Sequence, residues 1–384
     1  MAMEGIKIGW HCFRLSFSRE VRTALRKPVF HWLSWCFPLL LFGLIGSNFS
    51  EGTLQELPVS VVDNDHSQLS RTLIRKLDAG SHAQLTPASG GLSEAMRRMR
   101  DAQDYGLVYI PADFEADALA GRQPRVTFYY NALFYGAGFY STQDFGGLIS
   151  ELNANYRSIL AAKMGKTPPP LAQVELSYDS LFNASGSYVY YQQFAATIHL
   201  VQLFVVTCMI YVLARSKPLI YSSSFSMSLL GKLAPYTLCY TTLLMAEIAL
   251  LVWVFDARVV GNLFYMLCVA FFYVMAAQSI GLLLFTFTGS EITAYTLMGI
   301  MVSIALAFSG IVVPELSMSL PAQIISNIEP LTHALYAMFD LFLRKVPGRP
   351  VFSVCALLLM YPLIAGLLVR RRLPERLRKQ EVVL

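Results

Sequence analysis

The chain alternates between long apolar runs and one long polar stretch, and this pattern predicts a membrane protein. A helix needs about 20 mostly apolar residues to cross the hydrocarbon core, because it rises about 1.5 Å per residue. Six runs meet this requirement: 29–49, 193–214, 233–255, 262–286, 292–313 and 351–370. The predicted fold class is therefore an α-helical polytopic membrane protein with six transmembrane helices and an inserted α/β extracytoplasmic domain.

Basic residues beside the spans predict the orientation, because Lys and Arg accumulate in cytoplasmic loops. They cluster before the first span and after the last, and they flank the loop between the second and third spans. The connection between spans three and four carries only Arg258. The clusters are Lys7, Arg14, Arg19, Arg22, Arg26 and Lys27; Arg370, Arg371, Arg372, Arg376, Arg378 and Lys379; and Arg215, Lys217 and Lys232. We therefore expect both termini to be cytoplasmic, with a cytoplasmic amphipathic helix at 1–28 and a basic tail after the last span.

Residues 50–190 read as an α/β domain on the outer side, between the first span and a five-helix region at 191–384. "LPVSVVD", "YGLVYIP" and "RVTFYYNA" have the composition of strands, and "VELSYDSLF" is a fourth expected strand. "SQLSRTLIRKL" and "LSEAMRRMRDA" are expected helices, the first capped by Asp65 or Ser67. Apolar positions at helical spacing predict one long helix over 141–163.

Composition supports the membrane class and excludes several others. The 384 residues are 55% hydrophobic and 14% charged, whereas soluble domains carry about 25% charged residues. The net charge of +5 comes from residues next to the spans, so we expect no nucleic acid partner. None of the six cysteines lies between 50 and 190 or forms a C-x-x-C pair, so no disulfide framework or metal site is expected.

Motifs of catalysis are missing from the sequence. Gly231-Lys232 is followed by Leu233 where a P-loop requires Ser or Thr. We find no G-x-S-x-G elbow and no H-E-x-x-H helix. Asp63 and Asp65 fit turn and cap positions better than a metal site. We therefore expect no enzyme activity and no cofactor in this chain.

Polar residues inside the spans are functional candidates, because they are costly in hydrocarbon. Glu247 lies in the third expected span and Gln278 in the fourth. Glu247 fits proton coupling or substrate contact, and equally a structural hydrogen bond to a neighbouring helix. Gln278 fits a bond between helices.

The stretch "SGIVVPELSMSLPAQIISNIEPLTHALYA", residues 309–337, is apolar but interrupted by three prolines. Because proline removes an N–H and restricts the residue before it, we expect span five to end near Val313 and 314–328 to form a broken outer-leaflet segment. A short helix should begin at Pro330 with Leu331, Leu335, Met338 and Phe342 on one face. We interpret 314–345 as a re-entrant outer segment. The functional candidates in the spans and in this stretch are Glu247, Gln278, Ser309, Gly310, Pro314, Pro321, Glu329, Pro330 and His333.

Several of these stretches follow one known order, and the chain resembles the permease subunits of type-2 ABC transporters. The resemblance rests on "REVRTALRKPVFHWLSWCFPLLLF", "PVSVVDNDHSQLSRTLIRKLDA", "YGLVYIPADFEADALAGRQPRVTFYYNA", "LLGKLAPY" and the S-G-x-x-x-P … P-L-T-x-x-L pattern of 309–335. The second and third resemble the large external domain of one subgroup.

The resemblance implies a bacterial exporter of a lipophilic or amphipathic substrate, drug-like or lipid-like, in the cytoplasmic (inner) membrane. The functional candidates from Glu247 to His333 given above would then belong to the translocation path or the outer gate. A separate ABC ATPase subunit would bind ATP and Mg. A second permease chain, a periplasmic adaptor and membrane lipid are the other implied partners.

One departure concerns coupling. The family usually has an acidic, Glu-Arg-rich segment after span two, but "ARSKPLIYSSSFSMSLLGK" contains no acidic residue. Either coupling runs through the amino-terminal helix, or this chain is the weaker half of a heterodimer, which we favour. The coupling candidates are Arg14, Arg19, Glu20, Arg22, Arg26, Arg215, Lys217 and Lys232. A membrane-anchored receptor or scaffold, and an intramembrane enzyme using Glu247, are the alternatives.

Overall fold

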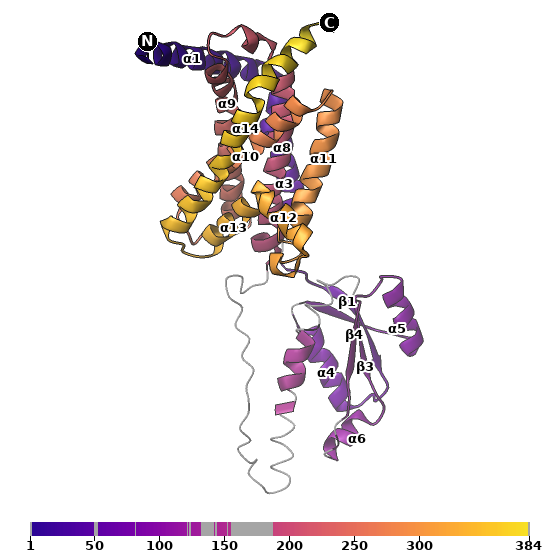
Figure 1. Cartoon of the computed structure of the whole chain (residues 1–384). Coiled ribbons are helices and arrows are strands. Elements are labelled where there is room, and N and C mark those ends of the chain that lie inside the picture. Colours follow the sequence, from indigo (N-terminus) through magenta and orange to yellow (C-terminus); the bar gives the residue numbers. More distant parts are fainter. Residues whose placement is uncertain are drawn as a thin grey trace. The chain divides into compact units, whose positions relative to one another are not determined.

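The computed structural model describes residues 2–49, 53–80, 82–120, 122, 124–131, 142, 144–151, 153–154 and 187–382. The chain divides into two compact units (Figure 1). The first, here the helical unit, combines Met1–Ser50 with Ser180–Leu384, and the second, the α/β unit, is Glu51–Asp179.

Within the described residues, six helices of the helical unit are long and apolar enough to cross a membrane, which confirms the six predicted spans. The first combines α2 (Pro28–His31), a π-helical turn (Trp32–Cys36) and α3 (Phe37–Ser47). The others are α8 (Phe194–Ala214, preceded by a π-helical turn at Val189–Gln193), α9 (Phe225–Val254), α10 (Leu263–Phe287), α11 (Glu291–Phe308) and α14 (Gly348–Val382).

Two helices are longer than the spans predicted within them, and one predicted boundary, the end of span five, was wrong. Helix α9 begins at Phe225, eight residues before the predicted start at 233, and α14 continues to Val382 through the basic tail instead of ending at 370. An apolar run measures the thickness of the hydrocarbon core, while polar and basic residues extend a helix beyond it. Helix α11 ends at Phe308, five residues before Val313, because Gly310 adopts a positive φ of 84° that terminates the helix.

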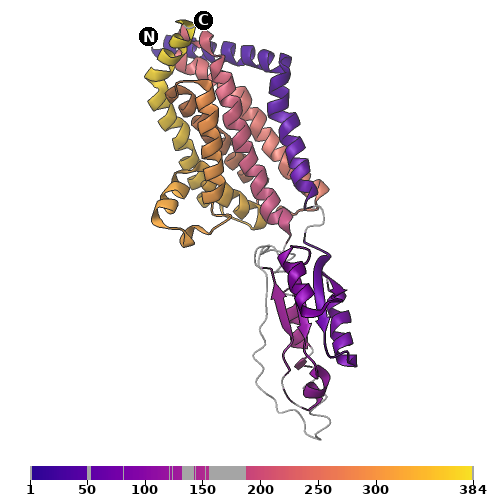
Figure 2. The same ribbon diagram turned by 90° about the vertical axis from the view of Figure 1, so that its right-hand side faces the viewer.

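Helix α1 (Ala2–Arg26) is the predicted amphipathic helix. It ends at Arg26, and Lys27 is extended because the following Pro28 disfavours helical backbone. In both views α1 crosses the direction of the spans, at the same end of the helical unit as the last turns of α14 (Figures 1 and 2).

The segment between α11 and α14 is more helical than predicted. A 3₁₀ turn (Glu315–Ser317) is followed by α12 (Leu320–Ile328) and α13 (Pro330–Leu343). Pro321 does not prevent α12, because it occupies the first turn, where its missing N–H is not needed. Helix α13 starts at Pro330 as predicted. Its predicted apolar face is buried: Leu331, Leu335, Met338 and Phe342.

The α/β unit contains a four-stranded sheet of order β2-β1-β3-β4. Strand β1 (Leu57–Asp63) pairs parallel with β2 (Ala83–Pro87) and β3 (Gly106–Ile110), and β3 pairs antiparallel with β4 (Thr127–Tyr130). Strand β2 was not predicted. Its short polar sequence, "AQLTP", lacks the β-branched enrichment that identifies a strand.

Helices cover both faces of this sheet. The helices are α4 (Gln68–Asp78), α5 (Gly91–Arg100) and α6 (Phe114–Leu119). Successive side chains of β1 point to opposite faces of the sheet. Val61 packs with Leu73 of α4, and Val62 packs with Ala95 of α5.

Caps in the α/β unit resolve the choice between Asp65 and Ser67. Ser67 Oγ accepts the Ser70 N–H at the start of α4 (3.0 Å), whereas Asp65 accepts the Glu115 N–H of α6 (3.1 Å). The expected strand "VELSYDSLF" lies outside the described residues, as does most of 141–163, of which 144–151 are helical.

Candidate functional site

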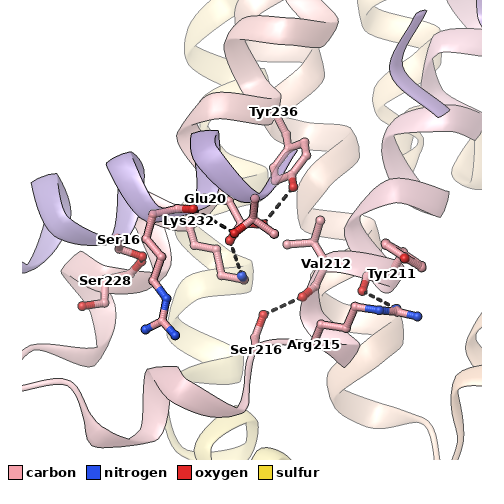
Figure 3. Close-up of polar contacts among 11 residues, drawn as sticks. Ser16, Glu20, Tyr211, Val212, Arg215, Ser216, Ser228, Lys232 and Tyr236 are labelled. Atoms are coloured by element: carbon pink, nitrogen blue, oxygen red, sulfur yellow. Dashed lines mark hydrogen bonds and ion pairs between the residues drawn. The ribbon is translucent and has the colours of Figure 1, made fainter. Parts of the chain in front are cut away.

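A buried carboxylate joins the amphipathic helix to the third span. Glu20 of α1 is 5% exposed, and its two carboxylate oxygens accept bonds from Lys232 Nζ at 2.5 Å and Tyr236 Oη at 2.8 Å (Figure 3). Both partners belong to α9. Because a buried charge is stable only when it is paired and hydrogen-bonded, this pair fixes the position of α1 along α9.

Close packing on the same side of α1 strengthens this attachment. Ser16 Oγ donates to the Ser228 carbonyl at 2.7 Å (Figure 3). Gly231 lies against the α1 backbone, where an added Cβ would be 2.3 Å from the Phe13 carbonyl oxygen. We call Ser16, Glu20, Ser228, Gly231, Lys232 and Tyr236 the α1–α9 clamp.

Beside the clamp is a pocket of about 1240 Å³ between α1, the end of α8 and the turn that follows it. We call it the basic pocket, because it is lined by Arg14, Arg19, Arg22, Arg26, Lys27 and Arg215, together with Lys232. Among the described residues that line it, Glu20 is the one carboxylate. Arg215 is held in place at the rim, where its guanidinium lies 3.5 Å above the centre of the Tyr211 ring.

The structure therefore brings the predicted coupling residues into one place. Seven of the eight, all except Lys217, line the basic pocket. The side chain of Lys217 lies outside the part of the chain that is described. The loop expected at 215–232 is shorter than predicted, because residues 225–232 already form the first turns of α9.

At the opposite end of the bundle, Glu329 links the α12–α13 junction to the core. Its carboxylate accepts a bond from Gln202 Nε2 of α8 at 2.6 Å. Tyr273 of α10 donates to Gln202 Oε1 and to the Ile198 carbonyl, each at 3.1 Å. Tyr361 of α14 donates to the Ile328 carbonyl at 2.7 Å. The junction is thus fastened to three spans.

Other predicted gate residues make bonds and close contacts within the segment between α11 and α14. His333 Nε2 bonds the Asn327 carbonyl at 2.9 Å, and Asn327 Nδ2 donates to Glu315 Oε1 at 2.7 Å. Gly310 has no room for a side chain beside the Tyr336 hydroxyl. Ser309 Oγ donates to the Leu306 carbonyl at 2.8 Å, at the end of α11.

Glu247 and Gln278 do not join either group. Gln278 accepts a bond from Thr237 Oγ1 at 2.9 Å and donates to the Leu233 carbonyl at 3.4 Å, so it connects α10 to α9 as predicted. Glu247 lies on α9 ten residues after Thr237, the partner of Gln278, which corresponds to about 15 Å along the helix. It is 3% exposed, and Oε2 has no hydrogen-bond partner among the described residues.

Three residues that complete these networks were missed in the sequence. Gln202 could have been found by the rule that identified Gln278, because it is a polar residue in an apolar span. Tyr236 and Tyr273 gave no signal, since a tyrosine in a span is read as an apolar side chain until its hydroxyl is placed.

Together, the six long apolar helices and the polar clusters at both ends of their bundle define a multi-pass membrane protein. The family model described as "ABC-2 family transporter protein" matches residues 28–370, which is most of the chain, and the chain belongs to this family. It is the membrane permease component of an ABC transporter, and its family partners with an ABC ATPase subunit. No curated protein matches the sequence.

Proposed function

We propose that the chain is the permease subunit of an ATP-driven exporter that moves a lipophilic or amphipathic substrate, drug-like or lipid-like. ATP and Mg bind to the separate ATPase subunit, and this chain receives the resulting motion. The observation that carries the proposal is the α1–α9 clamp, because it attaches an amphipathic helix outside the spans to one continuous helix that spans the bundle.

The clamp makes α1 and α9 one mechanical element. Glu20, Ser16 and Gly231 fix the two helices by charge, hydrogen bond and steric contact. Helix α9 has 30 residues, which corresponds to about 45 Å of helix. A push on α1 by the ATPase therefore moves α9 as a rigid body, the kind of displacement by which packed interfaces switch between two arrangements.

The outer segment supplies the other gate in this proposal. Residues 314–345 form a lid that the bond between Glu329 and Gln202 holds against α8. Movement of α9 reaches the lid through α8 and α10, which pack against α9 in the core. We propose that the lid opens when this bond breaks and that substrate leaves beneath it.

The assembly proposed here contains two permease chains and two ATPase subunits in the cytoplasmic membrane of a bacterium. A heterodimer is favoured because the segment after α8 lacks the acidic residues that family members use toward the ATPase. The α/β unit lies on the outer side and docks a periplasmic adaptor. This side follows from the distribution of basic residues.

The variant Glu20→Gln tests the clamp. It keeps the shape of the side chain but leaves Lys232 without its carboxylate, so α1 loses its fixed position on α9. With the cognate ATPase in proteoliposomes, we expect ATP-driven transport to fall at least about tenfold, which corresponds to about 1.4 kcal/mol, while the ATPase still co-purifies with the permease.

Glu375→Gln is the matched control, because Glu375 is an exposed carboxylate of α14 and its loss should leave transport unchanged. Transport by Glu20→Gln at the wild-type rate would remove the clamp from the mechanism. If the wild-type assembly stimulates no ATP hydrolysis with its partner, the exporter proposal fails and a receptor or scaffold role replaces it.

A further inference from the structure

The basic pocket contains more positive charge than the protein itself neutralises. Within the described chain, no carboxylate lies within ion-pair distance of Arg14, Arg19, Arg22 or Arg26. Glu20, the one acidic residue among those that line the pocket, is already paired with Lys232. Like charges gathered in one cavity repel each other, so the arrangement is stabilised by an anion from outside the chain.

Hydroxyl groups accompany these cations. Ser18 and Ser223 line the same pocket as the arginines. Guanidinium groups bind phosphate through paired N–H donors, and serine hydroxyls add single donors to the remaining oxygens. The combination matches a phosphate group better than it matches a carboxylate or a neutral ligand.

Helix α1 also indicates where the phosphate comes from. Its exposed side chains include Ile6, Trp10 and Leu25, which are large and apolar. A helix that exposes Trp, Ile and Leu side chains together with arginines suits the interface of a bilayer, where the apolar side chains enter the acyl region and the long basic ones reach the headgroups. At that depth the arginines of the basic pocket are level with lipid headgroups.

We propose that the basic pocket binds the phosphate headgroup of an anionic phospholipid of the cytoplasmic leaflet, through Arg19, Arg22 and Arg26 of α1 and Arg215 after α8. The bound lipid bridges α1 to the end of α8, as the α1–α9 clamp bridges α1 to α9. The cytoplasmic leaflet then contributes directly to the position of α1. The site uses arginines that are also candidates for coupling to the ATPase, but lipid binding itself requires neither the ATPase nor transport.

The test is lipid binding to the full chain, purified in neutral detergent without the ATPase and followed by native mass spectrometry. We expect phosphatidylglycerol to bind more tightly than phosphatidylcholine. The triple variant Arg19→Gln/Arg22→Gln/Arg26→Gln should weaken phosphatidylglycerol binding on the order of a hundredfold, since each basic residue facing an anionic lipid contributes about fivefold. Arg215→Gln alone should weaken it about fivefold, which provides a second measurement if the triple variant folds poorly.

The matched control is Arg370→Gln/Arg371→Gln/Arg378→Gln, which removes the same charge from exposed positions of α14. Equal weakening by the control would show diffuse charge attraction and overturn the proposal, as would equal binding of the two lipids. Full competition by millimolar inorganic phosphate would identify free phosphate as the ligand. If lipid binding survives in the pocket variants but capture of the ATPase is lost, the pocket binds the acidic surface of that protein instead.

Discussion

At the scale of single residues, Glu20 differs from every other charged residue of α1 that is described. It is the buried one, and it has two partners on another helix. The arginines at 14, 19, 22 and 26 are exposed. Charge alone therefore does not indicate a residue's role on this helix. Glu20 positions the helix, while the arginines face outward to a ligand or a partner.

In the α/β unit, Asp104 is likewise a buried carboxylate that is bonded to side chains of other elements. It is fully buried, and it accepts bonds from Ser60 Oγ and from Arg98 Nε and Nη2 at 2.7 and 2.8 Å. Burial by itself raises the pKa of this carboxyl, but the bonds from Arg98 and Ser60 outweigh burial and hold the pKa below its usual value. The carboxylate thus joins β1 to the end of α5.

Asp104→Asn should destabilise the α/β unit by about 2 kcal/mol, because the paired bonds from Arg98 to a carboxylate are replaced by a weaker bond to one neutral amide oxygen. In hydrogen–deuterium exchange of the full chain, the amides of β1 and β3 should exchange on the order of thirtyfold faster, while those of α8 stay unchanged. Unchanged exchange in β1 would show that Asp104 does not stabilise the sheet.

The wild-type chain should show the matching pH dependence. Because the folded pKa of Asp104 is lowered, its contribution is complete above the unfolded-chain pKa of about 3.9 and is lost as the pH falls through the lower folded value. Protection of β1 should therefore decline below about pH 4 in the wild type. In Asp104→Asn, the part of this loss of β1 protection that comes from Asp104 should be absent.

At the scale of elements, the contact between α1 and α9 depends on a residue with no side chain. Gly231 allows the backbones to approach, and the polar bonds of the clamp form only at that separation. The sequence "LLGKLAPY" shows this glycine but not its purpose, because a glycine within a helix also occurs where nothing packs. Gly366 in α14 is such a case, with no atom within 4 Å of an added Cβ.

Gly231→Ala should force α1 away from α9, since the new Cβ would meet backbone that cannot rotate aside. Overpacking of this kind costs about 1–3 kcal/mol. We expect faster hydrogen exchange throughout α1. Gly366→Ala, the control, should leave α1 exchange unchanged. Equal exchange of α1 in the two variants would show that the helices can separate without loss of α1 structure.

At the scale of the whole chain, the even number of spans agrees with the position of α1 and the end of α14 at one end of the helical unit (Figure 1). The rule for basic residues predicts that this end lies in the cytoplasm. Residues Glu51–Asp179 are inserted between the first and second spans. The same rule therefore predicts that they lie on the other side of the membrane.

Cysteine labelling tests this orientation. In a variant without the native cysteines, a membrane-impermeant maleimide added to intact bacterial cells should label Gln68→Cys, an exposed position of α4. It should label Arg378→Cys only after the cells are permeabilised, because the basic tail is retained in the cytoplasm. The reverse pattern would invert the topology and exclude Arg14–Arg26 as an ATPase contact.

The sequence by itself determined the six spans, the amphipathic helix and the start of α13, because burial in hydrocarbon and the covalent geometry of proline act locally. The family followed from the order of these local features, and the matching family model confirmed it. The tertiary structure decided which polar residues meet. The pairing of Glu20 with Lys232 and of Glu329 with Gln202 depends on how the helices pack. The same holds for Glu247, whose Oε2 has no hydrogen-bond partner among the described residues. The periodicity of a sequence does not record which neighbour a side chain will face.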